Sequence, residues 1–399
     1  MVNRLSGPVR THPATARSGR EYGRLAWEAD TYIAPGTAPE ECPVRGDQHI
    51  NDEGWRVASP IQMETRKVQL SGGTTYTISL PKRWAQEHRI DAGSVLALHP
   101  NGDGSILIET TTDRTSEDRA VSVDVSTASD SAIQQRILAL HAVGFDTVTL
   151  EDSTGHGPER RQLVEETLQE LSGFELLEVT DHRIRLTNLI DAENVDVRKS
   201  VLRLRLVMLA MHRDAVTAVI EGDEQLARRV VDRDSEADKL FAMVTRHFRR
   251  SLTDLHEVEK LDFSRDQLYE YYYAARQFER VADHAEKIAR FALEPNASVS
   301  ASYAADLSEL GSETRRVVDD AADAILTDAG IETANAALEK HQSLSTRIEE
   351  LDRELYDHDV PSEAYMLGLL LDSLRRSAEY GVNVASVAIQ QISRQNEQL

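Results

Sequence analysis

The sequence has 399 residues, with 45 Lys and Arg against 68 Asp and Glu and a formal net charge of -23. No stretch approaches about 18 consecutive apolar residues, and the amino terminus lacks a signal pattern, so we expect a cytoplasmic protein with no membrane insertion. The single cysteine, Cys42, excludes a disulfide framework and a cysteine-based zinc site, and an aromatic share of 5% favours helices.

Lysine is selectively scarce, since only 7 of the 45 basic residues are Lys. An acid-rich, lysine-poor surface is typical of a protein that works in concentrated salt, where the Debye length falls to about 3 Å at 1 M. High net charge then preserves solubility at little cost to compactness. We interpret the composition as resembling that of a halophilic archaeon, and an ordinary acidic protein is the alternative.

Residues 1–62 differ from the rest of the chain. They contain six of the eleven prolines and two of the three tryptophans, and no hydrophobic period persists in them. We interpret them as disordered, or as a mis-called extension of a native chain that begins at Met63. The alternative is a regulatory tail.

Residues 63–112 have the pattern of four short strands and one helix. Strands are predicted at 66–70 and 74–80, separated by Gly72 and Gly73, and a hairpin follows at 95–109. Pro81 opens the short helix between them, at a position where its missing N–H costs nothing. A unit of this size buries too little core to be stable alone, so we expect a homodimer.

The order of these elements resembles the AbrB/SpoVT family of swapped-hairpin domains. The resemblance lies in Ser79-Leu80-Pro81-Lys82 at the start of the helix and Asp91-Ala92-Gly93-Ser94 after it. In that family two chains interleave hairpins into one small barrel, which again implies a dimer.

Residues 119–190 alternate between strand and helix patterns. Strands are predicted at 120–125 and 147–151, each followed by a helix, and a closing hairpin spans 174–189. This order predicts a small α/β domain. It has neither a phosphate-binding loop nor a nucleophile elbow, so we interpret it as a connector, acting as a spacer or a sensor.

The remainder of the chain, 191–399, has an almost unbroken helical period. A first group of three helices is predicted within 191–295, where Gly222 separates the first helix from a second that runs to Leu255. The pattern recurs within 300–399, so we predict two tandem three-helix bundles. The fold class is therefore mainly α.

Two pairs of acidic residues stand four apart in the first repeat, namely Asp234 with Asp238 and Glu279 with Asp283. Residues at this spacing share a helix face, where like charges repel unless a cation lies between them. Two such pairs on neighbouring helices predict one site for a hard cation such as iron, manganese or magnesium. In a chain with 68 acids the alternative is a solvated acidic face.

The segments around these pairs resemble the PhoU family of phosphate-uptake regulators. RQFERVADHAEKIA at 276–289 is similar to the signature helix of that family, and VDRDSEADKL at 231–240 is similar to its other acidic helix. The resemblance covers 191–399. It implies that these acidic motifs bind metal ions and that the chain regulates phosphate uptake without being an enzyme.

The second repeat departs from this pattern. Arg375 aligns with Glu279 and Glu379 with Asp283, while Ile348 replaces Asp234 and Asp352 matches Asp238. Each motif keeps one carboxylate, and we predict that Arg375 pairs with Glu379. We therefore expect the strong metal site in the first bundle, with Asp352 and Glu379 as weaker candidates.

The complete order of domains resembles archaeal PhoU-like proteins fused to an AbrB-type domain, which implies possible DNA binding. Residues 63–112 hold five acids and five bases and are therefore neutral within an acidic chain. A dimer would present their basic residues twice to DNA phosphates, whereas the alternative is a barrel that only dimerises. The candidate DNA contacts are Arg66, Lys67, Lys82 and Arg83.

Our leading hypothesis is a dimeric regulator of phosphate homeostasis that contacts a phosphate ABC transporter or its regulatory machinery. The second is an AbrB-type transcriptional regulator in which the bundles sense a metal or a partner. The third, metal-assisted phosphoester hydrolysis, is weakened because no nucleophile–base constellation accompanies the acidic pairs.

Overall fold

The computed structural model describes residues 64–100, 104–110, 119–295, 299–327 and 329–397. The predictions for residues 1–62, including a start at Met63, lie outside the described residues. The described residues fall into two compact units, a small β unit at 64–110 and a helical unit at 119–397, and each is described here by itself.

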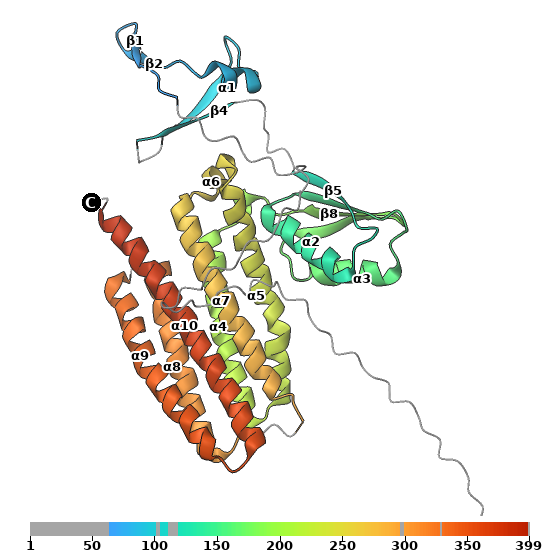
Figure 1. Ribbon diagram of the computed structural model, residues 1–399, viewed down its shortest axis with the longest axis vertical. Helices are drawn as coiled ribbons and strands as arrows, with labels where there is room; N and C mark the ends of the chain where they lie inside the picture. The colour runs from blue at the N-terminus through green and yellow to red at the C-terminus, as the bar shows by residue number, and fades with distance from the viewer. Residues whose placement is uncertain (1–63, 101–103, 111–118, 296–298, 328, 398–399) are drawn as a thin grey trace, which may run out of the picture. The chain divides into compact units, whose positions relative to one another are not determined.

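The small β unit contains two antiparallel pairs of strands and one short helix (Figure 1). Gly72 and Gly73 form the first turn at φ +63° and +82°, a backbone region that L-residues with a Cβ rarely adopt. The elements confirm the predicted order, with shorter first strands. They are β1 Gln69–Ser71, β2 Thr75–Thr77, α1 Lys82–Glu87, β3 Leu96–Pro100 and β4 Ile106–Thr110.

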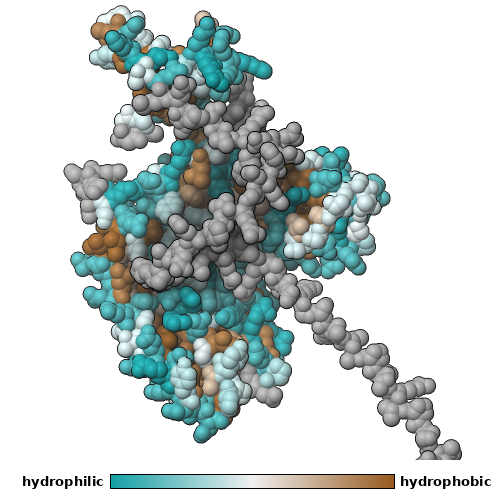
Figure 2. All heavy atoms as spheres, viewed as in Figure 1, coloured by the Kyte–Doolittle hydropathy of each residue, from teal (hydrophilic) through white to brown (hydrophobic). Residues whose placement is uncertain are grey.

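No residue of the small β unit is buried among those that the structure describes. Its apolar side chains instead face outward, as the brown atoms on this unit in Figure 2 show. Tyr76 and Val95 are 76% and 73% exposed. The other exposed apolar residues of the unit are Val68, Leu70, Ile78, Leu98, Ile106 and Leu107. A single copy of this unit therefore has no hydrophobic core.

The α/β module, residues 119–190, is a four-stranded sheet of order β5-β6-β8-β7, with β5 and β6 parallel and the other pairs antiparallel. Ile133 and Ile137 of α2 pack with Val148 and Leu150 of β6 in a core of its own. The predicted alternation is confirmed. The elements are β5 Ala120–Asp124, α2 Asp130–Val143, β6 Thr147–Glu151, α3 Pro158–Leu168, β7 Phe174–Val179 and β8 Arg183–Asn188.

Long helices make up the rest of the helical unit (Figure 1). The first bundle contains α4 Val197–Glu221, α5 Glu224–Ser251 and α7 Arg265–Phe291, with the short helices η1 Ala192–Asn194 and α6 Leu255–Leu261 beside it. The second bundle contains α8 Ala301–Leu326, α9 Gly330–Glu354 and α10 Pro361–Glu397, with η2 Leu355–Asp357 after α9.

The end of the second helix differs from the prediction, which extended this helix to Leu255. Helix α5 ends at Ser251, and α6 begins at Leu255. The Asp254 carboxylate accepts the backbone N–H of His256 at 3.0 Å, so it caps the new helix. The earlier boundary, at Gly222, is as predicted, since Gly222 ends α4 at φ +65° and Asp223 caps α5.

The two bundles share one hydrophobic core, formed where α4 meets α8 and α7 meets α10 (Figure 1). Polar contacts also join the helices of the two bundles. Arg205 of α4 donates to Asp319 and Asp323 of α8, and Asn383 of α10 donates to Gln277 of α7 at 3.2 Å. None of the helices in the described ranges offers an apolar stretch long enough to cross a lipid bilayer.

Candidate metal centre

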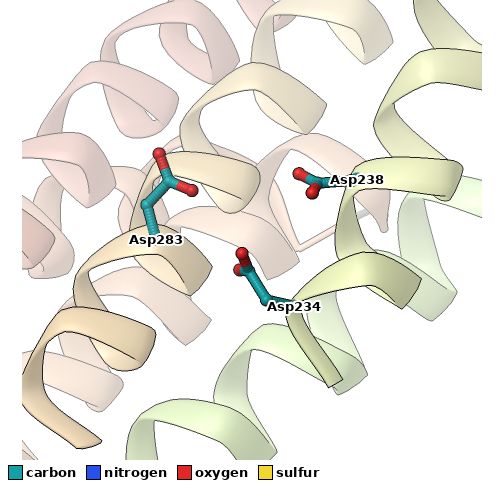
Figure 3. A group of neighbouring side chains, drawn as sticks. All are labelled: Asp234, Asp238 and Asp283. Atoms are coloured by element: carbon teal, nitrogen blue, oxygen red, sulfur yellow. The ribbon is translucent and has the colours of Figure 1, made fainter. Parts of the chain in front are cut away.

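Three carboxylates converge between α5 and α7. Asp234 and Asp238 project from one face of α5, and Asp283 projects toward them from α7 (Figure 3). One oxygen of each carboxylate lies within 4.8 Å of the others. The i,i+4 spacing stacks the first two on adjacent turns, and the packing of α5 against α7 brings the third. Oxygen ligands without nitrogen or sulfur suit hard cations.

The electrostatics of this cluster are those of like charges held together. Burial raises the pKa of the Asp238 carboxyl well above its ordinary value, and the charge of Asp234 raises this pKa further, as do Glu279 and Asp283. In the protein without metal, proximity therefore opposes ionisation of Asp238. A bound cation would offset this repulsion, because each carboxylate would be attracted to it.

Glu279 is not one of the three clustered residues, although the sequence suggested it as a fourth ligand. Its side chain is largely buried, and its Oε2 accepts a hydrogen bond from Nη1 of Arg276 on the same helix at 3.1 Å. Its charge still contributes to the raised pKa of Asp238. The structure therefore places Glu279 beside the cluster, within electrostatic reach of it.

Glu170 is a neighbour of the cluster that the sequence did not suggest. It follows α3 in the α/β module, burial raises the pKa of its carboxyl, and its charge contributes to the raised pKa of Asp238. Nearby, Ser172 Oγ donates to the carbonyl of Lys239 on α5 at 3.1 Å. Residue spacing could not have indicated Glu170, because it approaches Asp238 only through the packing of the α/β module beside α5.

His284 adjoins Asp283 in sequence, but its ring faces α10. The ring centroids of His284 and Tyr380 are 5.7 Å apart, which agrees with the expectation that successive residues on a helix point about 100° apart. His284 is not a member of the three-carboxylate cluster.

The second bundle pairs its charges differently from the prediction. Arg375 donates to Asp372 at 2.6 Å, and Glu379 accepts from Arg376 at 3.1 Å. The predicted pair of Arg375 with Glu379 is therefore wrong, because both residues find partners three positions away on α10. Asp352 is exposed on α9 and Ile348 is buried, and among the described residues neither Asp352 nor Glu379 joins a group of three potential ligands.

The four candidate DNA contacts are exposed in the small β unit. Arg66 pairs with Glu64, and Arg83 pairs with Glu87 at 2.8 Å. Lys82 and Arg83 begin helix α1, and Arg66 and Lys67 precede strand β1. Two of the four basic side chains therefore already have a carboxylate partner nearby in the sequence, two residues away for Arg66 and four residues away for Arg83.

Comparison with known families supports both resemblances. Residues 185–292 match the PhoU domain, and residues 69–116 match the family described as antidote-toxin recognition MazE, bacterial antitoxin. The chain therefore carries a PhoU domain over its first bundle, preceded by a segment that matches this antitoxin family. All three clustered aspartates lie within the PhoU match. No curated protein matches the chain.

Two solved structures are similar to about half of the chain. The crystal structure of PhoU from Pseudomonas aeruginosa is 23% identical, with 51% of this chain and 98% of that chain covered and a TM-score of 0.43. The phosphate transport system regulatory protein PhoU from Streptococcus pneumoniae is 16% identical, with 48% of this chain and 91% of that chain covered and a TM-score of 0.40.

Proposed function

We propose that this protein regulates phosphate transport through metal-dependent contacts between its helical bundles and a phosphate transporter or its regulatory machinery. The observation that carries the proposal is the PhoU domain match, within which the three clustered aspartates lie. In this role the protein is a regulator and carries out no reaction of its own.

The metal part of the proposal is supported by the donor set. Asp234, Asp238 and Asp283 offer three carboxylates from two helices, which suits iron, manganese or magnesium. A cation held by them would join α5 to α7 and relieve the repulsion that raises the pKa of Asp238. Metal occupancy would thereby stiffen the first bundle and the surface it presents to a partner.

The proposed homodimer is supported by the small β unit. Its strands expose apolar side chains, and none of its described residues is buried. A second copy that interleaves its hairpins would cover these side chains, since a unit of this size lacks the area to form a core alone. Two helical units would then be joined through their amino-terminal segments.

The second candidate function is a DNA-binding transcriptional regulator whose bundles sense a metal or a partner. The match of residues 69–116 to an antitoxin family favours it. The dimer would present Arg66, Lys67, Lys82 and Arg83 twice to the phosphates of one duplex. Because Arg66 and Arg83 already pair with glutamates, Lys67 and Lys82 would supply most of the phosphate contacts.

One pair of measurements separates the two functions. Purified full-length protein, loaded with manganese or iron or stripped with chelator, is tested for binding to the ATPase subunit of a phosphate transporter. The same samples are titrated with duplex DNA at several salt concentrations. Metal-dependent binding to the transporter subunit supports the first function, and binding to DNA alone supports the second. Metal-independent binding to the subunit would contradict the metal part of the proposal.

A further inference from the structure

The turn that joins α9 to α10 exposes two tyrosines. Tyr356 lies in η2 and is 85% exposed, and Tyr365 lies in α10 and is 72% exposed. Val360, between them in the sequence, is 47% exposed. The whole chain has only 11 tyrosines, and tyrosine is enriched in protein interfaces. Two tyrosines this exposed and this close in the sequence therefore mark the turn as a candidate contact surface.

The turn itself is anchored to α8. Nε2 of His358 donates to Oε2 of Glu363 at 3.0 Å, and Oε1 of the same carboxylate accepts the backbone N–H of Ser300, just before α8, at 2.6 Å. The ring of His358 also meets the ring of Tyr303 edge to face, with 5.3 Å between the centroids. A partner that binds here would therefore meet a fixed backbone, which lowers the entropic cost of binding.

The segment around the two tyrosines is strongly acidic. Residues 349–365 contain seven acids and a single Lys or Arg, Arg353, whose Nε donates to a backbone carbonyl of its own helix at 3.1 Å. The side chains of Glu354, Asp357 and Asp359 are exposed, and within the described ranges their carboxylates form no hydrogen bond or ion pair. The turn therefore presents negative charge that these ranges do not neutralise.

The chain itself shows which cation suits rings and carboxylates together. The guanidinium carbon of Arg276 lies 5.3 Å from the ring centroid of Phe241, while its Nη1 donates to Glu279 at 3.1 Å. Arg280 lies over the ring of Tyr380 at 5.5 Å in the same way. A planar guanidinium can stack on a ring while its edge pairs with a carboxylate, which the ammonium of lysine does less well.

We propose that the exposed face of this turn binds an arginine-bearing segment of a partner protein. The face consists of Glu354, Tyr356, Asp357, Asp359, Val360 and Tyr365. Guanidinium groups of the partner would stack on the tyrosine rings and pair with the carboxylates. Nucleic acids and anionic membranes are poor occupants, because their negative charge repels that of the face. The proposal concerns the second bundle and does not depend on the proposed function.

The test uses the full-length chain and two synthetic helical peptides, which differ only in carrying arginine or lysine at every fourth position. Fluorescence anisotropy measures their affinities. We expect the arginine peptide to bind saturably at one site per chain, and the lysine peptide to bind about fivefold more weakly. Replacement of both Tyr356 and Tyr365 by Ser, which removes the rings, should weaken binding of the arginine peptide about tenfold.

Tyr269→Ser is the matched control for the rings, because Tyr269 is 45% exposed on α7 and should not affect binding. Replacement of Asp357 and Asp359 by Asn should weaken binding severalfold. The matched control for charge replaces Glu332 and Glu339, both exposed on α9, by Gln and should retain the affinity of the wild type. Circular dichroism verifies that each variant folds.

Four outcomes would overturn the proposal. The first is that neither peptide binds saturably, and the second is that the double tyrosine variant binds as tightly as the wild type. The third is equal loss of affinity in the Asp and Glu double variants, which would mean that the overall acidity of the chain attracts the peptide. The fourth is self-association of the wild type that the tyrosine variant loses, since the occupant is then a second copy.

Discussion

Arg246 of α5 is joined to Asp146 of the α/β module by an ion pair in which Nη2 lies 2.5 Å from Oδ1. Nη1 of the same guanidinium donates to the carbonyls of His141 and Phe145 at 3.0 and 2.8 Å. The guanidinium carbon also lies 5.6 Å from the centroid of the Phe174 ring. Because one buried side chain serves all of these partners, the α/β module is fixed to the helix that carries Asp234 and Asp238.

Arg246→Met should destabilise the protein by about 3 kcal/mol, because it leaves Asp146 and two carbonyls with fewer partners in a buried setting. Chemical denaturation monitored by circular dichroism measures the change. Arg203→Met is the control, since Arg203 forms an exposed pair with Glu236 and should cost at most about 1 kcal/mol. Equal losses in the two variants would contradict a special role for Arg246.

Asp283→Asn should remove most bound metal, because it takes away the carboxylate that α7 contributes to the cluster. Glu379→Gln should change metal content little, since Glu379 pairs with Arg376. Elemental analysis of protein purified after growth with iron and manganese gives the metal content per chain. Equal loss in both variants would indicate a second metal centre in the second bundle. If the wild type contains no metal, the aspartates form an acidic face that binds none.

Metal should also stabilise the folded protein. A cation that binds only the folded state contributes about 2.7 kcal/mol at a hundredfold excess over its Kd. Calorimetric melting with and without manganese should therefore show a rise in melting temperature for the wild type and for Glu379→Gln. The same rise in Asp283→Asn would mean that the stabilising metal binds elsewhere.

Stability should fall in acid because of two buried histidines. Burial lowers the pKa of His141 and of His212 from 6.5 to about 3, with Arg246 acting on His141 and Arg315 on His212. Each therefore binds a proton more readily when unfolded, so the free energy of unfolding falls as pH drops from 6.5 toward 3. The slope is about 1.4 kcal/mol per pH unit for each histidine.

The variants His141→Gln and His212→Gln should each flatten this acid slope, which urea titrations at a series of pH values measure. The two histidines lie in different parts of the helical unit, one in the α/β module and one between the bundles, so their effects on the slope should add. An unchanged slope in the double variant would assign the acid sensitivity to other groups.

Ile106→Asp should disrupt the proposed dimer, because Ile106 is an exposed apolar residue on β4 that a second copy would cover. Sedimentation should then show monomers. Tyr356→Asp is the matched control, as Tyr356 is 85% exposed in the helical unit. A wild-type monomer, or a dimer that survives Ile106→Asp, would show that the small β unit does not mediate association.

Replacement of Lys67 and Lys82 by Ala should reduce the salt dependence of DNA binding. Each lost phosphate contact lowers the slope of log affinity against log salt by about 0.9, counted once per subunit of a dimer. Band-shift titrations across salt measure the slope, with Lys199→Ala as a control because Lys199 is exposed on α4. No duplex binding by the wild type even at low salt would contradict the DNA-binding hypothesis.

The sequence by itself determined the order of the elements and which residues share a face of a helix. The alternation of strands and helices in 119–190 and the helical period of 191–399 arise from local spacing and turn residues, and so does the break at Gly222. The same spacing places Asp234 and Asp238 on one face of α5, because neighbours on a helix are set by 3.6 residues per turn.

Only the tertiary structure decided which side chains meet across elements and which of several neighbours each charged side chain contacts. It placed Asp283 beside the pair on α5, turned Glu279 to Arg276, and gave Arg375 to Asp372. It also brought Glu170 within electrostatic reach of Asp238. These outcomes depend on how whole helices and modules pack, and on which of several nearby partners each charged side chain reaches, neither of which residue spacing specifies.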